Sequence, residues 1–313
     1  MERETEKIFE RIKEKNCHTI SVVGLAKNVG KTTVVNFLLR GLERACVITI
    51  GRDGEEKDVI YNVPKPGVHV PKGSFAVVPC SVLPEWGEIL ETFEAASGKV
   101  ALVKAKIDVD VQTVRVGSFE VTAKMLKELM KYCDDVLVDG ALGRTGISAY
   151  TDCTVLVTGA EIGRNVEEVV LKTVRAFKRI STTPVETETA EKLRKFSSKV
   201  VVGKNGRVFE VDVDGVAGHE EEIVKASEKA DFVYLPGAVT DEIASKLECD
   251  IIVPNSGNIF SDSGKFKVLN PTRVVGVAVN SSSVKGLEMD SSELIFELQK
   301  QLNDIIVFDV LHA

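Results

Sequence analysis

The sequence predicts an α/β fold: a mainly parallel sheet with helices on both faces, plus a smaller C-terminal α/β region. Two observations predict it. Short apolar runs that end at glycine or at a polar residue alternate with segments whose apolar residues recur at helical spacing. In addition, 44% of the 313 residues are hydrophobic, which is sufficient for a large buried core. We therefore expect a globular protein rather than a disordered chain.

Most of this alternation lies in the first 185 residues. Residues 1–18 are expected to form an N-terminal helix with Ile8, Phe9 and Ile12 on one face. A strand at 19–23 ends at Gly24, and the first domain is expected to span 19–185. Its further elements are expected as strands at 45–50, 100–107, 136–138 and 154–157 and helices at 31–44, 119–132 and 163–180.

The pattern changes at residues 181–191, which are polar, contain a proline and lack a clear period. We place a boundary there and treat 186–313 as a C-terminal α/β region. Residues 199–212 alternate around Asn205-Gly206, a strong signal for a β-hairpin. The α/β alternation then returns, with helices expected at 241–247 and 291–302. This region either extends the first sheet or forms a second small domain.

Charge and cysteine content exclude several classes of protein. The chain has 40 basic and 47 acidic residues, a net charge of −7, which argues against broad nucleic-acid binding. The six cysteines and four histidines are scattered without metal-binding spacing, so we expect reduced core cysteines in a cytoplasmic protein. No apolar run approaches the roughly 18 residues of a membrane span, and the charged N-terminus has no apolar stretch typical of a secretory signal.

The strongest chemical signal is the segment SVVGLAKNVGKTT, Ser21 to Thr33, in which a strand leads through a loop directly into a helix. This is the context of a P-loop (Walker A motif), whose backbone N–H groups surround phosphate oxygens at the positive end of a helix. Lys31 would reach the β- and γ-phosphates, and the Thr32 hydroxyl would ligate magnesium. The usual pattern has glycine or alanine where this chain has Leu25. The predicted nucleotide-binding residues of this segment are Gly24, Lys27, Asn28, Val29, Gly30, Lys31, Thr32 and Thr33.

A second carboxylate is needed to hold magnesium at the end of a neighbouring strand. Asp139 follows the apolar run Val136-Leu137-Val138 and precedes Gly140, which fits this role. An ordinary aspartate in a turn is the alternative interpretation.

These motifs resemble known families. A glycine followed by five residues and Gly-Lys-Thr resembles the phosphate loops of dethiobiotin synthetase and the cobyrinic acid amide synthases, in the P-loop class that includes ParA/MinD-type ATPases. Residues 27–33 also resemble the loop of molybdopterin-guanine-dinucleotide biosynthesis adapters. The phrases GLAKNVGKTT, IGRDGE, LVDGALGR and VLVTGAEIGRN, in scattered blocks of residues 21–172, together resemble proteins associated with the reactivation of adenosylcobalamin-dependent lysine 5,6-aminomutase.

The resemblance implies further roles. Asp53, between Gly51 and Gly54, would be the switch aspartate that touches magnesium or the attacking water; a solvated turn is the alternative. Lys27 resembles, displaced by one position, the lysine that crosses the dimer interface of ParA/MinD-type ATPases. This resemblance is compatible with a homodimer. Asn280 resembles the strand-ending asparagine near adenine in dethiobiotin synthetase. Since no strand ends in the guanine motif Asn-Lys-x-Asp, we favour ATP over GTP.

Two functions remain open. The first is magnesium-dependent nucleotide hydrolysis coupled to a partner protein, with reactivation of a cobalamin-dependent aminomutase as the instance that the resemblance implies. The alternative is an ATP-dependent synthetase acting on a small acid, with Lys65-Pro66-Gly67 and Arg144 as substrate-binding candidates. We favour the first and expect neither nucleic-acid nor membrane partners.

Overall fold

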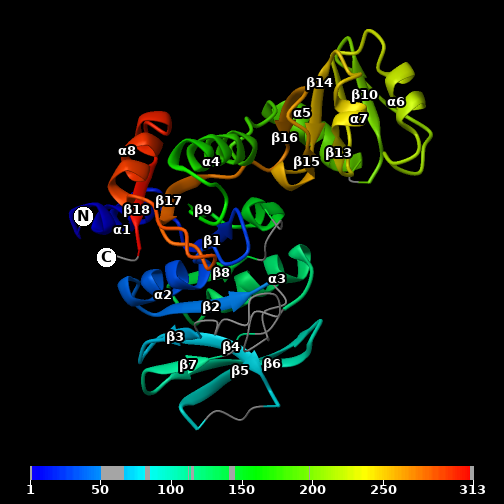
Figure 1. Ribbon diagram of the computed structural model, residues 1–313. Coiled ribbons are helices and arrows are strands. Elements are labelled where there is room, and N and C mark those ends of the chain that lie inside the picture. Colours follow the sequence, from blue (N-terminus) through cyan, green and yellow to red (C-terminus); the bar gives the residue numbers. More distant parts are fainter. Residues whose placement is uncertain are drawn as a thin grey trace. The chain divides into compact units, whose positions relative to one another are not determined.

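A computed structural model of the chain describes residues 2–50, 67–81, 85–111, 113, 116–140, 145–196 and 198–310. The chain divides into two compact units (Figure 1). Unit 1 comprises Met1–Phe177 and Arg273–Ala313, and unit 2 comprises Lys178–Thr272. Unit 2 is thus inserted between two parts of unit 1. The region 186–313, which we expected as one C-terminal segment, contributes to both units.

The larger sheet belongs to unit 1 and, in the described part of the chain, has nine strands in the order β18-β17-β9-β1-β8-β2-β4-β6-β5. All neighbouring pairs from β18 to β4 are parallel, whereas β6 pairs antiparallel with β4 and β5. The prediction of an α/β fold with a mainly parallel sheet is therefore confirmed. The strands are β1 (Thr19–Gly24), β2 (Ala45–Thr49), β4 (Phe75–Pro79), β5 (Gly87–Ala95), β6 (Gly98–Ala105), β8 (Asp135–Asp139), β9 (Cys153–Gly159), β17 (Val274–Asn280) and β18 (Ile306–Asp309).

Both faces of the central strands are covered, because consecutive residues of β1, β2, β8 and β9 are buried almost without interruption. On one face, Ile8 of α1 and Leu38 of α2 share a hydrophobic cluster with Val22. The helices of unit 1 are α1 (Glu2–Glu14), α2 (Lys31–Gly41), α3 (Phe119–Leu129), the 3₁₀ helix η1 (Thr145–Tyr150), α4 (Val166–Ile180) and α8 (Ser291–Gln301), and β3 (Val68–Val70) pairs with β7 (Val109–Val111) in a separate ribbon.

Several helices are shorter than predicted: α3 ends at Leu129 rather than at 132, and the helix expected at 241–247 ends at Ala244. Helix α2 ends at Gly41 rather than at 44, and Leu42 is already extended. A Cβ at Gly41 would lie 2.1 Å from Cζ of Phe9, so the close packing of α1 leaves no space for a side chain there. Helix α4 begins at Val166 rather than at 163, because the Asn165 side chain caps it by accepting the Glu168 N–H at 2.9 Å.

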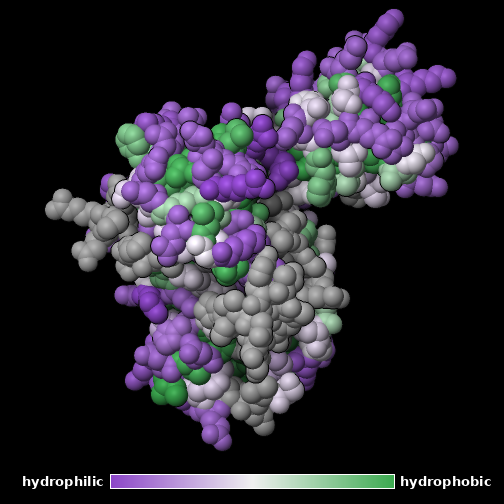
Figure 2. All heavy atoms as spheres, in the orientation of Figure 1, coloured by the Kyte–Doolittle hydropathy of each residue, from purple (hydrophilic) through white to green (hydrophobic). Residues whose placement is uncertain are grey.

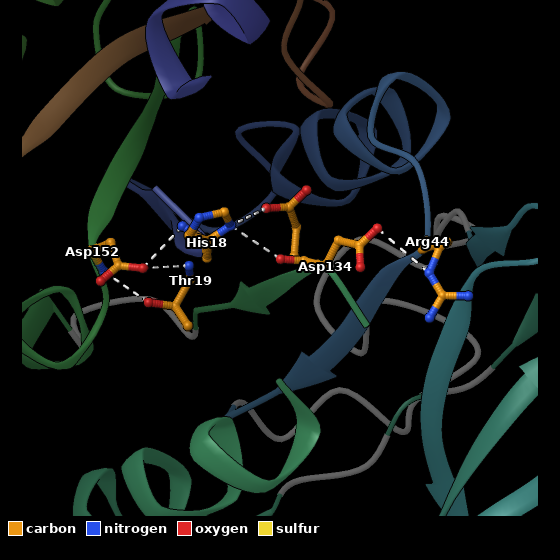
Figure 3. Close-up of polar contacts among 6 residues, drawn as sticks. His18, Thr19, Arg44, Asp134 and Asp152 are labelled. Atoms are coloured by element: carbon orange, nitrogen blue, oxygen red, sulfur yellow. Dashed lines mark hydrogen bonds and ion pairs between the residues drawn. The ribbon is translucent and has the colours of Figure 1, made fainter. Parts of the chain in front are cut away.

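The amino ends of β1, β8 and β9 are closed by side chains that bind backbone groups (Figure 3). Asp152 Oδ2 accepts the His18 N–H at 2.9 Å and the Thr19 N–H at 2.7 Å. His18 Nδ1 lies 3.3 Å from Asp135 Oδ1. These contacts join residues that are more than one hundred positions apart in the sequence, and we call this group the amino-end cluster.

Unit 2 is a smaller α/β sandwich. Among its described residues, the five-stranded sheet has the order β11-β10-β12-β14-β16, with β12, β14 and β16 parallel. The hairpin between β10 and β11 turns at Asn205 and Gly206, both with positive φ, which confirms the hairpin prediction. The elements of unit 2 are α5 (Thr187–Leu193), η2 (Arg194–Phe196), β10 (Val201–Lys204), β11 (Arg207–Glu210), α6 (Glu220–Ala226), β12 (Phe232–Tyr234), β13 (Val239–Thr240), α7 (Asp241–Ala244), β14 (Asp250–Val253), η3 (Ser256–Asn258), β15 (Ile259–Phe260) and β16 (Lys265–Val268).

On the face shown in Figure 2, hydrophilic side chains predominate over the placed residues and hydrophobic ones are scattered. Every helix in the described ranges is too short or too polar to cross a membrane. All six cysteines are free, and Cys17, Cys46, Cys133 and Cys153 are buried.

Candidate functional site

The predicted site residues that the structure describes lie at one edge of the larger sheet. In parallel strands this edge is formed by the carboxyl ends, outside which ligands of α/β proteins bind. Val22 of β1 is the register partner of Asp139, which ends β8, and Gly24 ends β1 two residues later. On the other side of β1, Asn280 at the end of β17 is the register partner of Gly159 at the end of β9.

The two ends of the loop between β1 and α2 lie in contact with each other. A Cβ at Gly24 would lie 2.7 Å from Cγ and 2.8 Å from Cδ of Lys31, so the lysine side chain lies directly against the backbone of Gly24. Within the loop, Asn28 (φ 61°) and Gly30 (φ 99°) have left-handed backbone conformations. Val29 is buried in the core, so its side chain anchors the loop and only its backbone is available to a ligand.

The N-terminus of α2 is arranged for a negative charge. Gly30 is its N-cap and provides no side-chain hydrogen bond, and its first turn contains no acidic residue. The first turn instead carries Lys31, followed by Thr32 and Thr33. A lysine at the positive end of a helix dipole is electrostatically unfavourable by itself. An anion bound at this end would remove that penalty and would accept hydrogen bonds from the first-turn N–H groups.

Asp139 is held in place through its backbone. Its carbonyl oxygen accepts the Thr49 hydroxyl at 3.3 Å and the Ile50 N–H at 3.1 Å, while the following residue, Gly140, donates its N–H to Val22 at 3.0 Å. A Cβ at Gly140 would lie 2.9 Å from the Val22 oxygen, so a side chain there would crowd the end of β1. Asp139 is only 4% exposed. Thr49 was not identified from the sequence, because a threonine that ends a strand carries no distinctive signal.

Several predicted residues cannot be placed. Asp53, Lys65, Pro66 and Arg144 lie outside the described residues. Within the described ranges, no group of three or more histidine, cysteine, aspartate or glutamate side chains is arranged to hold a metal ion. Magnesium bound together with a nucleotide needs fewer protein ligands, because it commonly takes one or two carboxylates and completes its shell with phosphates and water. The hard oxygen donors of Thr32 and Asp139 fit that chemistry.

A charged pair that sequence analysis did not identify lies beside this edge. Glu161 lies in the loop after β9, and Lys285 lies in the loop after β17. Their side chains form an ion pair in which Glu161 Oε1 is 3.1 Å from Lys285 Nζ. The Glu161 side chain is 6% exposed, and its Oε2 is buried without a hydrogen-bond partner among the described residues. The pair therefore joins the β9 and β17 loops by charge. The sequence signal is only the position of Glu161, two residues after a strand that ends in glycine.

No model of a known protein family matches the chain, and no curated protein matches it. The geometry of this edge and the sequence motifs that form it are therefore the basis for a functional proposal.

Proposed function

We propose that this chain binds magnesium and a nucleoside triphosphate, ATP in preference to GTP, and hydrolyses the nucleotide as a P-loop NTPase. The observation that carries the proposal is the closed loop from Gly24 to Lys31, with its lysine and an uncapped helix N-terminus at the carboxyl edge of a parallel sheet. Asp139 on the adjacent strand supports it.

Each residue has a chemical role in this proposal. The backbone N–H groups of the loop and the ammonium of Lys31 neutralise phosphate charge. Thr32 and Asp139 would hold the magnesium, which would supply stabilisation of phosphate charge. Asp53 is the proposed third polar group and would orient the attacking water. The buried position of Asp139 keeps its carboxylate in a low-dielectric environment, where such electrostatic contacts are strongest.

We further propose that hydrolysis acts on a partner protein, with an adenosylcobalamin-dependent aminomutase as the first candidate. Three of the four phrases that resemble the reactivation proteins fall wholly or partly on described elements of this edge: GLAKNVGKTT on β1, the loop and α2, LVDG on β8, and VLVTGAEIGRN on β9 and its loop. The proposed site of action is the cytoplasm.

The test is calorimetric titration with ATP, with and without magnesium, followed by hydrolysis assays. Wild-type protein should bind ATP in a magnesium-dependent manner, and Lys31→Ala should lose both binding and turnover, because Lys31 neutralises phosphate in the ground state and in the transition state. Lys127→Ala, on the exposed face of α3, is the matched control. Equal ATP binding by wild-type protein and Lys31→Ala would contradict the proposal.

A second assay separates the two uses of the nucleotide. If a partner protein is acted on, the purified chain should hydrolyse ATP slowly, and the aminomutase should accelerate it. Turnover of roughly 10 per second on a small acid, without added protein, would instead indicate a synthetase.

A further inference from the structure

Asn280 contacts three loops at the carboxyl edge of the sheet. Its backbone oxygen accepts the Ala160 N–H at 2.9 Å, which fixes the start of the β9 loop. Its side-chain Oδ1 accepts the Ser282 N–H at 3.1 Å, which shapes the start of the β17 loop. The backbone contact is close, since a Cβ at Gly159 would lie 1.8 Å from the Asn280 oxygen.

The third contact is with the phosphate loop. A Cβ built on Gly30 would lie 3.0 Å from Nδ2 of Asn280 and 3.5 Å from its Cβ. Gly30 is the last loop residue before α2, and its φ of 99° is strained for any residue with a side chain. The Asn280 carboxamide therefore lies directly against Gly30, the residue whose backbone sets the entry into α2, and a side chain at position 30 would press on it.

The hydrogen bonds also define the orientation of the carboxamide. Because Oδ1 is engaged by Ser282, the amino end of the carboxamide is the end directed at Gly30. An asparagine that reads a purine base uses both its oxygen and its amino group toward that base. Here, contact of both groups with a base would require the Ser282 hydrogen bond and the packing against Gly30 to be given up.

We propose that Asn280 is a positioning residue for the phosphate loop: it holds Gly30 in the conformation that binds the polyphosphate chain and does not recognise the base. This inference rests on the proposed nucleotide function. In this proposal Asn280 affects binding of the triphosphate portion of the nucleotide, whereas the sequence resemblance implies that it contacts adenine.

The experiment compares the affinities of wild-type protein, Asn280→Ala and Asn280→Asp for three magnesium-loaded probes: ATP, GTP and inorganic tripolyphosphate. Asn280→Asp retains an oxygen for Ser282 and lacks the amino group. We expect Asn280→Ala to lower the affinity for all three probes by the same factor, about five- to tenfold. The ratio of ATP affinity to GTP affinity should not change. Asn280→Asp should lower these affinities at least as much, because it directs negative charge toward the phosphate loop.

The opposite pattern would overturn the inference. If tripolyphosphate binds all variants equally while the preference for ATP over GTP disappears in Asn280→Ala, the residue reads the base. Asn270→Ala, which removes a comparable side-chain hydrogen bond to a backbone oxygen in unit 2, is the control and should change none of the affinities. Failure of the wild-type protein to bind any of the three probes would overturn the proposed function as well as this inference.

A measurement without ligand provides an independent readout. In unliganded Asn280→Ala, amide hydrogen exchange at residues 25–30 should be faster than in wild-type protein, whereas exchange in β10 and β12 of unit 2 should be unchanged. Unaltered exchange in the loop would contradict the positioning role even if the affinities fall.

Discussion

The two ends of the same central strands are built in different ways. At the amino ends of β1, β8 and β9, the acidic side chains of Asp152 and Asp135 contact backbone and side-chain groups of His18 and Thr19 (Figure 3). At the carboxyl ends, the close contacts involve glycines: Gly24 against Lys31 and Gly30 against Asn280. One end satisfies its polar groups internally, and the other brings backbone close together and leaves a helix N-terminus without a side-chain cap.

We expect the amino ends of these strands to contribute mainly to stability and their carboxyl ends mainly to the proposed ligand binding. The amino-end cluster ties together distant parts of the chain, so substitutions that remove its hydrogen bonds to backbone N–H groups should lower the free energy of unfolding with little effect on ligand binding. Substitutions at the carboxyl edge should lower binding or turnover with little effect on folding, because neither Gly24 nor Lys31 provides a core side chain.

After Lys31→Ala, which should lose both binding and turnover, the largest effect is expected for Asp139→Asn. The substitution preserves shape and removes the charge that we propose to hold magnesium, which should cost about 2–4 kcal/mol of transition-state stabilisation. That corresponds to a roughly thirty- to thousandfold fall in ATP turnover, without a lower melting temperature. Wild-type turnover and an unchanged magnesium dependence would show that Asp139 is not the magnesium ligand.

The next largest effect is expected for Gly24→Ala. The new Cβ would lie within 3 Å of Lys31 Cγ and Cδ and of Val29 Cγ1, so the side chains that shape the loop must shift. Because small misplacements at a reacting centre are costly, turnover should fall about 10–100-fold. Gly215→Ala is the control, since its Cβ would meet nothing within 4 Å. Undiminished turnover in Gly24→Ala would mean that the contact between Lys31 and Gly24 is not needed for activity.

At the amino end, Asp152→Ala should destabilise the fold and leave nucleotide affinity unchanged. It removes the acceptor of two backbone N–H groups, at His18 and Thr19, which should cost about 1–3 kcal/mol in the free energy of unfolding. Chemical denaturation measures this loss, and Asp214→Ala, at an exposed position, provides the reference. A fall in nucleotide affinity without destabilisation would reverse the comparison between the two ends.

The smallest effect concerns pH. Burial raises the pKa of Asp135 above its ordinary value, and the neighbouring His18 opposes this shift. A raised pKa means that the protonated form is favoured in the folded state. The stability it contributes is complete below about pH 3.8, the ordinary value, and is lost as pH rises through the higher folded value. Asp135→Asn should therefore be more stable than wild type at neutral pH, by about 1 °C in Tm. The advantage should vanish in acid, and an advantage that grows in acid would contradict this assignment.

Local sequence patterns were sufficient to predict much of unit 1. The strand at 19–24, the helix from Lys31 and the strand ending at Asp139 were predicted because each is determined by a run of apolar residues and its terminating glycine or polar residue. Strands β4 and β5 were not predicted; β5 is an edge strand with many exposed positions and lacks a distinct apolar period.

Such local patterns did not predict which strands pair when they are far apart in the sequence. Asn280 was expected to end a strand, but the sequence did not determine whether that strand, β17, extends the first sheet. Nothing local in its residues encodes its pairing with β9. The same limit applies to the site. Gly30 and Asn280 are 250 positions apart, so their contact depends on the order of strands and not on a motif.

The insertion of unit 2 has a consequence for synthesis on the ribosome. When β9 leaves the exit tunnel, its partner β17 has not yet been translated, because all of unit 2 lies between them. The side of β9 that β17 will cover is then an exposed, strongly apolar strand edge, of the kind that recruits other chains. Since domains generally fold as units during translation, unit 2 can fold while unit 1 is still incomplete. The nascent chain is therefore most prone to aggregation in this interval, and a chaperone that covers β9 would act before residue 274 is made.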